Sequence, residues 1–92
     1  MFYLVAFDIS DDKARARAVK VLKGYGHRVQ KSVFECPDLT EKQLLKLKDR
    51  LESVIDAGSD SVRYYFQCKR CIQAFELSGF GEAPSIAEFG VA

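Results

Sequence analysis

The sequence predicts an α+β fold in which two helices cover one face of an antiparallel sheet. Three observations predict it. An apolar run rich in strand formers opens the chain, apolar residues then recur at helical spacing in two segments, and alternating apolar and polar residues follow each of them. At 92 residues, of which 48% are hydrophobic and 29% charged, the chain has the size and composition of one small globular domain. A core of this size is marginally stable, so an oligomer is expected.

The first predicted element is a strand from Phe2 to Phe7, continuously apolar and therefore buried on both faces, which ends at Asp8. Ser10 is expected to cap a helix whose first turn holds Asp11 and Asp12, where the helix dipole favours negative charge. The residues that recur at helical spacing are Ala14, Ala18, Val21, Leu22 and Tyr25. Gly24 and Gly26 are expected to end the helix.

The segment from Arg28 to Cys36 alternates apolar and polar residues, with a disturbance at Gln30 to Ser32. This pattern fits either a tight hairpin or a bulge within one strand. Thr40 and Gln43 then have the spacing of a capping box, which predicts the start of a second helix. The apolar stripe of that helix is Leu44, Leu47, Leu51, Val54 and Ile55.

A turn over Ala57 to Asp60 precedes an alternating strand from Val62 to Gln67, and Cys71 to Leu77 is predicted to form one more strand. This order fits a ferredoxin-like βαββαβ fold with an additional C-terminal strand. An added edge strand commonly pairs with a second copy, which predicts a two-fold homodimer with strand exchange at the sheet edge. Residues 1–77 are expected to form the domain, including this fifth strand, and residues 78–92 an extended C-terminal tail.

The opening apolar run is too short to span a membrane and has no basic leader or small-residue cleavage site, so a cytoplasmic location is expected. The three cysteines have no framework spacing, which agrees with a reducing compartment. Cys68 and Cys71 have CxxC spacing, but a zinc site needs further ligands and the chain offers only Cys36 and His27. A redox pair is not expected either, because this pair is predicted to join two strands instead of opening a helix. His27 is expected to be a capping or surface residue.

The net charge of +1 hides a basic block with no acidic residue in it. The block comprises Lys13, Arg15, Arg17, Lys20, Lys23, Arg28 and Lys31. Lys13, Arg17 and Lys20 recur on one helical face, which favours a track for the phosphates of a nucleic acid over the alternative of a merely solvated face. After Arg70 all charged residues are glutamates, so the C-terminal end could bind a basic partner.

Asp8 is a candidate ligand for Mg²⁺, because it ends the predicted central strand beside the start of a helix. This cation usually takes one or two protein carboxylates and completes its shell with water and phosphate oxygens. Two copies of Asp8 related by a dimer axis would supply such a pair. The alternative is that Asp8 merely ends the strand and helps the next helix to begin. No Ser-His-Asp or Cys-His arrangement and no phosphate-binding glycine loop can be identified.

The run FYLVAFDISDDKARARAVKVLKGYGHRVQKSVFEC, followed by DSVRYYF, resembles the CRISPR-associated Cas2 family of spacer acquisition in antiviral defence. The resemblance extends from the first strand to about Phe66. It implies a ferredoxin-like homodimer in which the fifth strand of each chain joins the sheet of the other. It also implies a metal-dependent endonuclease acting on single-stranded RNA or double-stranded DNA, or an adapter that bridges two dimers of the Cas1 integrase on prespacer DNA.

By the same resemblance, Asp8 is the catalytic and metal-binding residue, and with its dimer mate it would hold one Mg²⁺ or Mn²⁺ per homodimer. Phe7 stands where the family often has tyrosine, so only packing or stacking remains for it. The resemblance assigns nucleic-acid contact to Arg15, Arg17 and Arg28, which the basic block extends to Lys20 and Lys31, and it places Ser10, Ser32 and Phe34 near the site. No side chain is identified as a general base, which predicts slow cleavage.

The segment APSIAEF, Ala83 to Phe89, resembles the tail that some members of the family use against their partner. The alternative is a disordered terminus. An acidic tail of this kind would dock the integrase in the adapter hypothesis.

Overall fold

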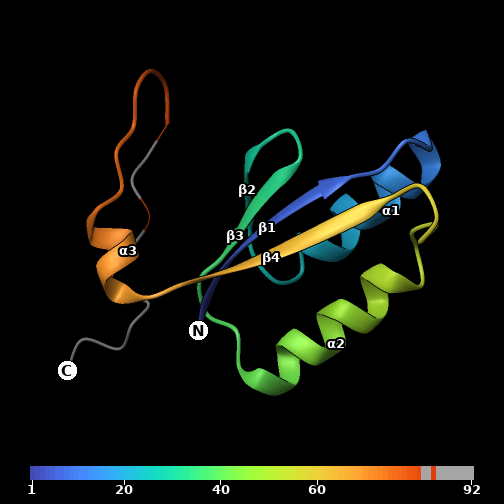
Figure 1. The fold of residues 1–92 in the computed structure, drawn as a ribbon, viewed down its shortest axis with the longest axis horizontal. Coiled ribbons are helices and arrows are strands. Elements are labelled where there is room, and N and C mark those ends of the chain that lie inside the picture. The colour runs from blue at the N-terminus through green and yellow to red at the C-terminus, as the bar shows by residue number, and fades with distance from the viewer. Residues whose placement is uncertain (82–83, 85–92) are drawn as a thin grey trace.

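The computed structural model describes residues 1–81 and residue 84. The strands are β1 (Phe2–Asp8), β2 (His27–Gln30), β3 (Val33–Cys36) and β4 (Ser61–Gln67), and the helices are α1 (Asp12–Leu22), α2 (Glu41–Glu52) and α3 (Lys69–Gln73). The four strands form one antiparallel sheet in the order β2-β3-β1-β4 (Figure 1). This order, with β1 and β3 in the centre, confirms the predicted ferredoxin-like arrangement of an α+β fold.

The hydrophobic core lies between α1, α2 and one face of the sheet. Val5 of β1 and Phe34 of β3 are completely buried, as are Leu22 of α1 and Leu47 of α2. The predicted stripe of α2 is confirmed for Leu44, Leu47 and Leu51, which are buried. Val54 and Ile55 also pack against the cluster, but they lie beyond the end of α2 at Glu52. Burying one leucine side chain contributes roughly 2 kcal/mol to the free energy of unfolding. This packing leaves the opposite face of the sheet without a covering from α1 or α2.

The start of α1 differs from the prediction by one residue. Asp11, not Ser10, is the N-cap, and its carboxylate accepts a hydrogen bond from the backbone N–H of Ala14 at 2.8 Å. Ile9 is buried in the core, so the chain must pass Ser10 before it can turn into the helix. Both residues are good N-caps, and the anchoring of Ile9 decides between them.

Two other local predictions concern the start of α2 and the segment after α1. The capping box at Thr40 is confirmed, with Gln43 bonded to it reciprocally. For the segment after α1, the hairpin is the alternative that occurs: β2 and β3 are separate strands joined by a tight turn. Their register shifts between Arg28 and Gln30. Gly26 is required before this hairpin, because a Cβ there would lie 2.1 Å from the carbonyl oxygen of Glu35.

The predicted fifth strand is wrong for this structure. Cys71 to Leu77 does not extend along the sheet. Helix α3 occupies Lys69–Gln73, and no regular element follows it within the described residues. A strand needs a neighbour for its backbone groups, whereas a helix bonds them within the segment and here also buries Ile72. Strand exchange in a homodimer therefore remains a prediction. The tail segment from Ala83 to Phe89 lies outside the described residues except for Pro84.

Among the described helices, none combines the length and the apolar character that crossing a membrane requires.

Candidate metal and nucleic-acid site

A cavity of about 300 Å³ opens at the end of β1. Its walls come from β1, from α1 and from the turn between β2 and β3. The lining residues are Phe7, Asp8, Ile9, Arg15, Lys31 and Ser32. The structure thus brings together five of the residues assigned to the site from the sequence, one of them a carboxylate and two of them cations.

Asp8 is exposed, and its carboxylate forms no hydrogen bond or ion pair with any residue that the structure describes. In the β1–β4 ladder it stands opposite Ser61, whereas the β1–β3 ladder reaches only Ala6 and Val33. Because side chains alternate along a strand, Asp8 shares its face of the sheet with Leu4 and Ala6, the face that α1 and α2 leave uncovered. An unpaired carboxylate at this position is available to a ligand.

Arg15 is held beside Asp8 by the backbone of the preceding loop. Its guanidinium donates a hydrogen bond to the carbonyl of Ile9 at 3.2 Å and forms an ion pair with Asp12. Asp12 therefore does more than complement the helix dipole, since it also fixes the guanidinium. Arginine binds phosphate through two parallel N–H donors, and this tether reduces the entropy lost when it does so.

The turn between β2 and β3 is fixed by Arg28. Its Nε and Nη2 donate to the carbonyl of Lys31 at 3.0 and 2.5 Å, and its guanidinium carbon lies 6.0 Å from the centre of the Phe34 ring. The carbonyl of Ser32 in the same turn accepts a bond from the N–H of Phe7 at 3.0 Å. Arg28 is therefore a positioning residue that holds Lys31 and Ser32 at the cavity, which the sequence did not indicate.

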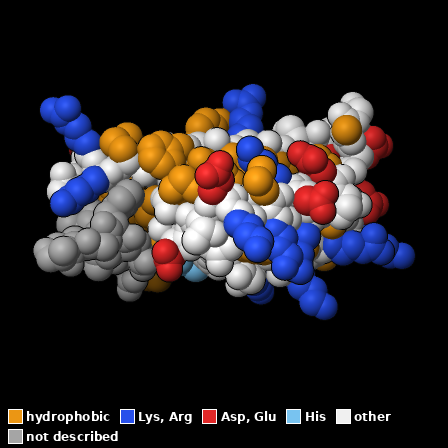
Figure 2. Space-filling view, turned by 90° about the horizontal axis from the view of Figure 1, so that it is seen from below, with side chains coloured by type: hydrophobic (Ala, Val, Ile, Leu, Met, Phe, Trp, Pro, Cys, Tyr) orange, Lys and Arg blue, Asp and Glu red, His pale blue; other side chains and the backbone are white. Residues whose placement is uncertain are grey.

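The remaining cations of α1 lie outside the cavity. Lys13, Arg17 and Lys20 are exposed, and none of them is ion-paired within the described part of the chain. Acidic and basic side chains are intermixed on the face seen from below, across which α2 runs (Figure 2). Between Lys13 and Lys20 the sequence of α1 contains no acidic residue.

Three residues placed near the site by resemblance have structural partners of their own. The rings of Phe7 and Phe34 are buried and tilted against each other, with centroids 6.4 Å apart, so Phe7 packs in the core. Phe34 lies behind the cavity and does not line it. The backbone N–H and the hydroxyl of Ser10 bond to Asp60 at 3.2 and 3.4 Å, away from Asp8.

Sequence reasoning missed Asp60. Its carboxylate accepts hydrogen bonds from the N–H of Asp56 at 2.9 Å, from Ser10, and from the hydroxyl of Ser59. These bonds, that of Asp56 first, lower the pKa of Asp60 below its ordinary value. The turn sequence DAGSD signals an aspartate that bonds nearby backbone. Its distant partner, Ser10, could not be identified from the sequence.

The fit of a divalent cation to this cavity is partial. No cluster of three or more His, Cys, Asp or Glu side chains suited to a metal occurs among the described residues. Asp8 supplies one hard oxygen ligand, which suits Mg²⁺, and the other charged groups lining the cavity, Arg15 and Lys31, are cations. One chain thus offers half of a carboxylate pair together with two phosphate-binding groups.

The CxxC pair differs from its prediction, whereas His27 agrees with its own. Cys68 is the N-cap of α3, so the CxxC pair opens a helix and does not join two strands. The Sγ atoms of Cys68 and Cys71 lie 3.4 Å apart. His27 is a surface residue, as predicted, and its Nε2 lies 3.3 Å from a carboxylate oxygen of Glu35 on the uncovered face of the sheet.

Comparison with known proteins decides the family. The family model described as CRISPR associated protein Cas2 matches residues 1–74. The chain belongs to the Cas2 family. A relative from Chloroflexus aurantiacus, named CRISPR-associated endoribonuclease Cas2 1, is 40% identical over 89 residues, which are 96% of this chain and 95% of the relative. The resemblance found in the sequence is thereby confirmed.

Solved Cas2 structures share the fold. The structure of Streptococcus pyogenes Cas2 at pH 6.5 has 34% identity and a TM-score of 0.77, and the match covers 86% of this chain and all of that one. A chain from a partial Cas6-RT-Cas1–Cas2 complex has 29% identity and a TM-score of 0.73, with 91% of this Cas2 chain and 94% of that chain covered.

Proposed function

We propose that this Cas2 chain acts in CRISPR spacer acquisition as a homodimeric, metal-dependent endonuclease whose metal ligand is Asp8. The observation that carries the proposal is the unpaired carboxylate of Asp8 at a cavity whose other charged groups are Arg15 and Lys31. The name of the Chloroflexus aurantiacus relative, an endoribonuclease, supports cleavage of RNA. The charged groups of the cavity suit a phosphate and a cation. Both RNA and duplex DNA carry such phosphates.

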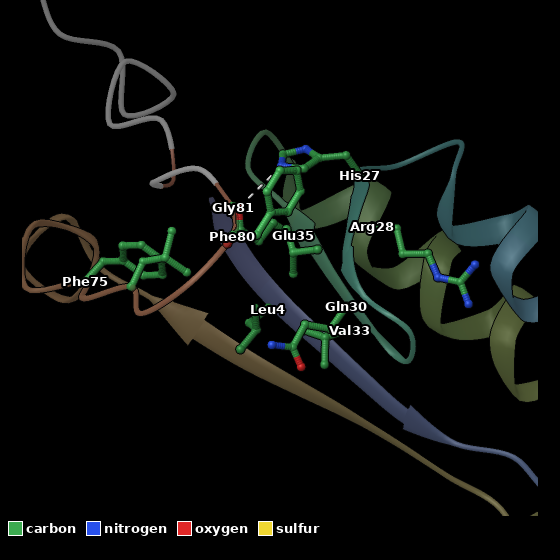
Figure 3. A pocket seen from close by; sticks show the side chains of 11 residues that line it. Leu4, His27, Arg28, Gln30, Val33, Glu35, Phe75, Phe80 and Gly81 are labelled. Atoms are coloured by element: carbon green, nitrogen blue, oxygen red, sulfur yellow. Dashed lines mark ion pairs between the residues drawn. The ribbon is translucent and has the colours of Figure 1, made fainter.

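The position of Asp8 on the uncovered face of the sheet supports the proposed homodimer. That face carries a second cavity of about 550 Å³, to which Leu4, Gln30 and Val33 contribute from the sheet, and Phe75 and Phe80 from the segment after α3 (Figure 3). Phe80 is fully exposed, and about half of the Leu77 side chain is exposed. A second copy packed here would cover apolar surface and bring a second Asp8 toward the first.

In this dimer the two Asp8 carboxylates would hold one Mg²⁺ or Mn²⁺. The ion, when bound, polarises the scissile phosphate and lowers the pKa of a water molecule for attack at phosphorus. Arg15 binds the phosphate oxygens and Lys31 adds positive charge from the opposite wall. The residues that line the cavity include no histidine and no second acid to take a proton. Cleavage is therefore expected to be slow.

The test compares Asp8→Asn with the wild-type homodimer, using single-stranded RNA and duplex DNA substrates in a magnesium series with a chelator control. Asp8→Asn keeps the size of the side chain and removes its charge, so it should reduce magnesium-dependent cleavage to background. Asp38→Asn is the matched control, because Asp38 is exposed and has no hydrogen bond or ion pair within the described residues. Cleavage by Asp8→Asn at the wild-type rate would refute the proposal.

A second candidate is a non-catalytic adapter that binds prespacer duplex DNA and bridges Cas1 dimers. Two observations favour it. The cations of α1 outside the cavity have no ion-pair partners in the described part of the chain, and a chain of similar fold occurs in a Cas1–Cas2 complex. An integration assay with the cognate integrase separates the two functions, since Asp8→Asn abolishes spacer integration only if cleavage by this site is needed.

A further inference from the structure

Two of the three cysteines lie together at the start of α3. Cys68 and Cys71 are both exposed, and their Sγ atoms are 3.4 Å apart, within the distance of a sulfur hydrogen bond. A disulfide bond is about 2 Å long, so these thiols are reduced and need to approach by little more than 1 Å. Cys36 is buried in the core and belongs to another part of the molecule.

The backbone at this point has the conformation that a disulfide requires. Cys68 is the N-cap of α3 and Cys71 follows three residues later, so both lie on one turn. The Cα atoms of a disulfide are at most about 7 Å apart. In an extended strand, residues three positions apart are separated by about 10 Å. The helical turn therefore permits the bond, and an extended chain through Cys68 to Cys71 excludes it.

The surroundings also favour reaction at Cys68. The backbone amide of Cys71, and then its thiol, lower the pKa of Cys68. Lys69 and Arg70 between the two cysteines place positive charge beside the thiolate. By contrast, burial raises the pKa of Cys36 to about 11, which makes it inert. The chain thus has one attacking thiolate with a second thiol in position to resolve the product.

We propose that Cys68 and Cys71 are a redox site that forms a reversible intramolecular disulfide by exchange with a low-molecular-weight disulfide such as oxidised glutathione. The Cys68 thiolate attacks one glutathione sulfur and releases one glutathione thiolate. The Cys71 thiolate then attacks Cys68 Sγ in the mixed disulfide and releases the second. The protein loses two protons and two electrons, and oxidised glutathione becomes two molecules of the reduced thiol.

The bond would act on the junction between the sheet and the C-terminal segment. Strand β4 ends at Gln67, and the N–H of Ile72 donates to the carbonyl of Cys68 at 3.2 Å across the same turn. A disulfide would hold this turn closed and prevent β4 from extending beyond Gln67. It would also fix the direction in which the chain leaves β4 toward Phe75 and Phe80 at the second cavity. This site is independent of the nuclease proposal.

The experiment uses the full chain, reduced and then exposed to oxidised glutathione, with acid quenching, alkylation, intact mass and peptide mapping. The wild type should form one disulfide between Cys68 and Cys71, with Cys36 still reduced, and dithiothreitol should reverse it. Cys71→Ser should accumulate a stable mixed disulfide at Cys68. Cys68→Ser should react more slowly by about tenfold, because the activated thiolate is lost. Both cysteines are exposed, so these variants should fold normally.

The proposal also predicts slower hydrogen exchange at the Ile72 amide after oxidation. A disulfide that formed without closing this turn would not slow that exchange. Three results would overturn it. These are a mixed disulfide that persists in the wild type, a disulfide that joins two chains, and thiols protected by a metal ion that a chelator removes.

Discussion

The carboxylate of Asp60 accepts hydrogen bonds from both the backbone N–H and the hydroxyl of Ser10, a residue fifty positions earlier in the chain. These bonds connect the loop after β1 to the turn before β4. The next pair in the sheet is Asp8 with Ser61. The edge of the sheet that carries the candidate metal ligand is therefore braced by the bonded carboxylate of Asp60, whereas the carboxylate of Asp8 has no partner among the described residues.

The bonds to Asp60 should make stability depend on pH in the acid range. Its pKa in the folded protein is below the ordinary value of 3.8, so the ionised form contributes stability above about 3.8, and this contribution is lost as pH falls through the folded pKa. Asp60→Asn should therefore be less stable than the wild type at pH 7, with a smaller difference at pH 3, as measured by urea unfolding. Asp38→Asn is the control. An Asp60→Asn deficit that stayed equal at both pH values would contradict the assignment.

The hydroxyl of Tyr64 should be a destabilising group. Its oxygen is buried and has no hydrogen-bond partner among the described residues. Burial, and then the charge of Glu52, raises the pKa of Tyr64 to about 12. Tyr64→Phe removes a polar atom that is desolvated without compensation, so it should stabilise the protein by about 1 kcal/mol and raise Tm by about 5 °C.

The control for Tyr64→Phe is Tyr65→Phe. The hydroxyl of Tyr65 accepts a hydrogen bond from Arg63 at 3.2 Å on the exposed side of β4, so its loss should change Tm little. Calorimetry of both variants checks the prediction. A lower Tm for Tyr64→Phe than for the wild type would mean that the hydroxyl is satisfied after all.

The cations of α1 should dominate binding to nucleic acid. Arg17 and Lys20 are exposed and have no ion-pair partner in the described part of the chain, whereas Arg15 is already bonded to Ile9 and Asp12. Replacing Arg17 and Lys20 by Glu should weaken duplex binding and lower the slope of log affinity against log salt by about two, one for each lost phosphate contact. Fluorescence anisotropy over a salt series measures both quantities.

The matched control makes the same charge change on α2. Lys42→Glu with Lys46→Glu alters two exposed lysines on a helix of mixed charge, so the salt slope should stay near that of the wild type. Equal losses from the two helices would mean that net charge, not the α1 surface, governs binding.

The uncovered face of the sheet should be the dimer interface. Leu4 lies in the centre of that face and lines its cavity, so Leu4→Asp should give a folded monomer, as measured by light scattering and circular dichroism. Leu45→Asp is the control, because Leu45 is 62% exposed on α2. A monomer mass for the wild type would contradict both the interface and the shared metal site.

Local patterns in the sequence were sufficient for most of the fold. The apolar run ending at Asp8, the capping box at Thr40 and the leucine stripe of α2 are short-range signals, and each predicts its element because the physical cause lies within a few residues. The cations of α1 are equally local. Asp8, Arg15 and Lys31 were identified as site residues from charge, position and the family resemblance, although their convergence on one cavity follows from the order of the strands.

Only the tertiary structure decided what depends on distant partners. Cys71 to Leu77 has enough apolar residues for a strand, but it has no neighbouring strand in the chain. Its first residues instead belong to α3, where backbone groups bond within the helix. Arg28 was predicted from the sequence to contact nucleic acid, and only the hairpin shows that its guanidinium also binds the carbonyl of Lys31. Ser10 was predicted to cap a helix, but in the folded chain its backbone N–H donates to the distant Asp60. The sequence by itself determined which residues carry charge and apolar surface. The packing of the chain determined which of them are bonded and which, like Asp8, have no partner among the described residues.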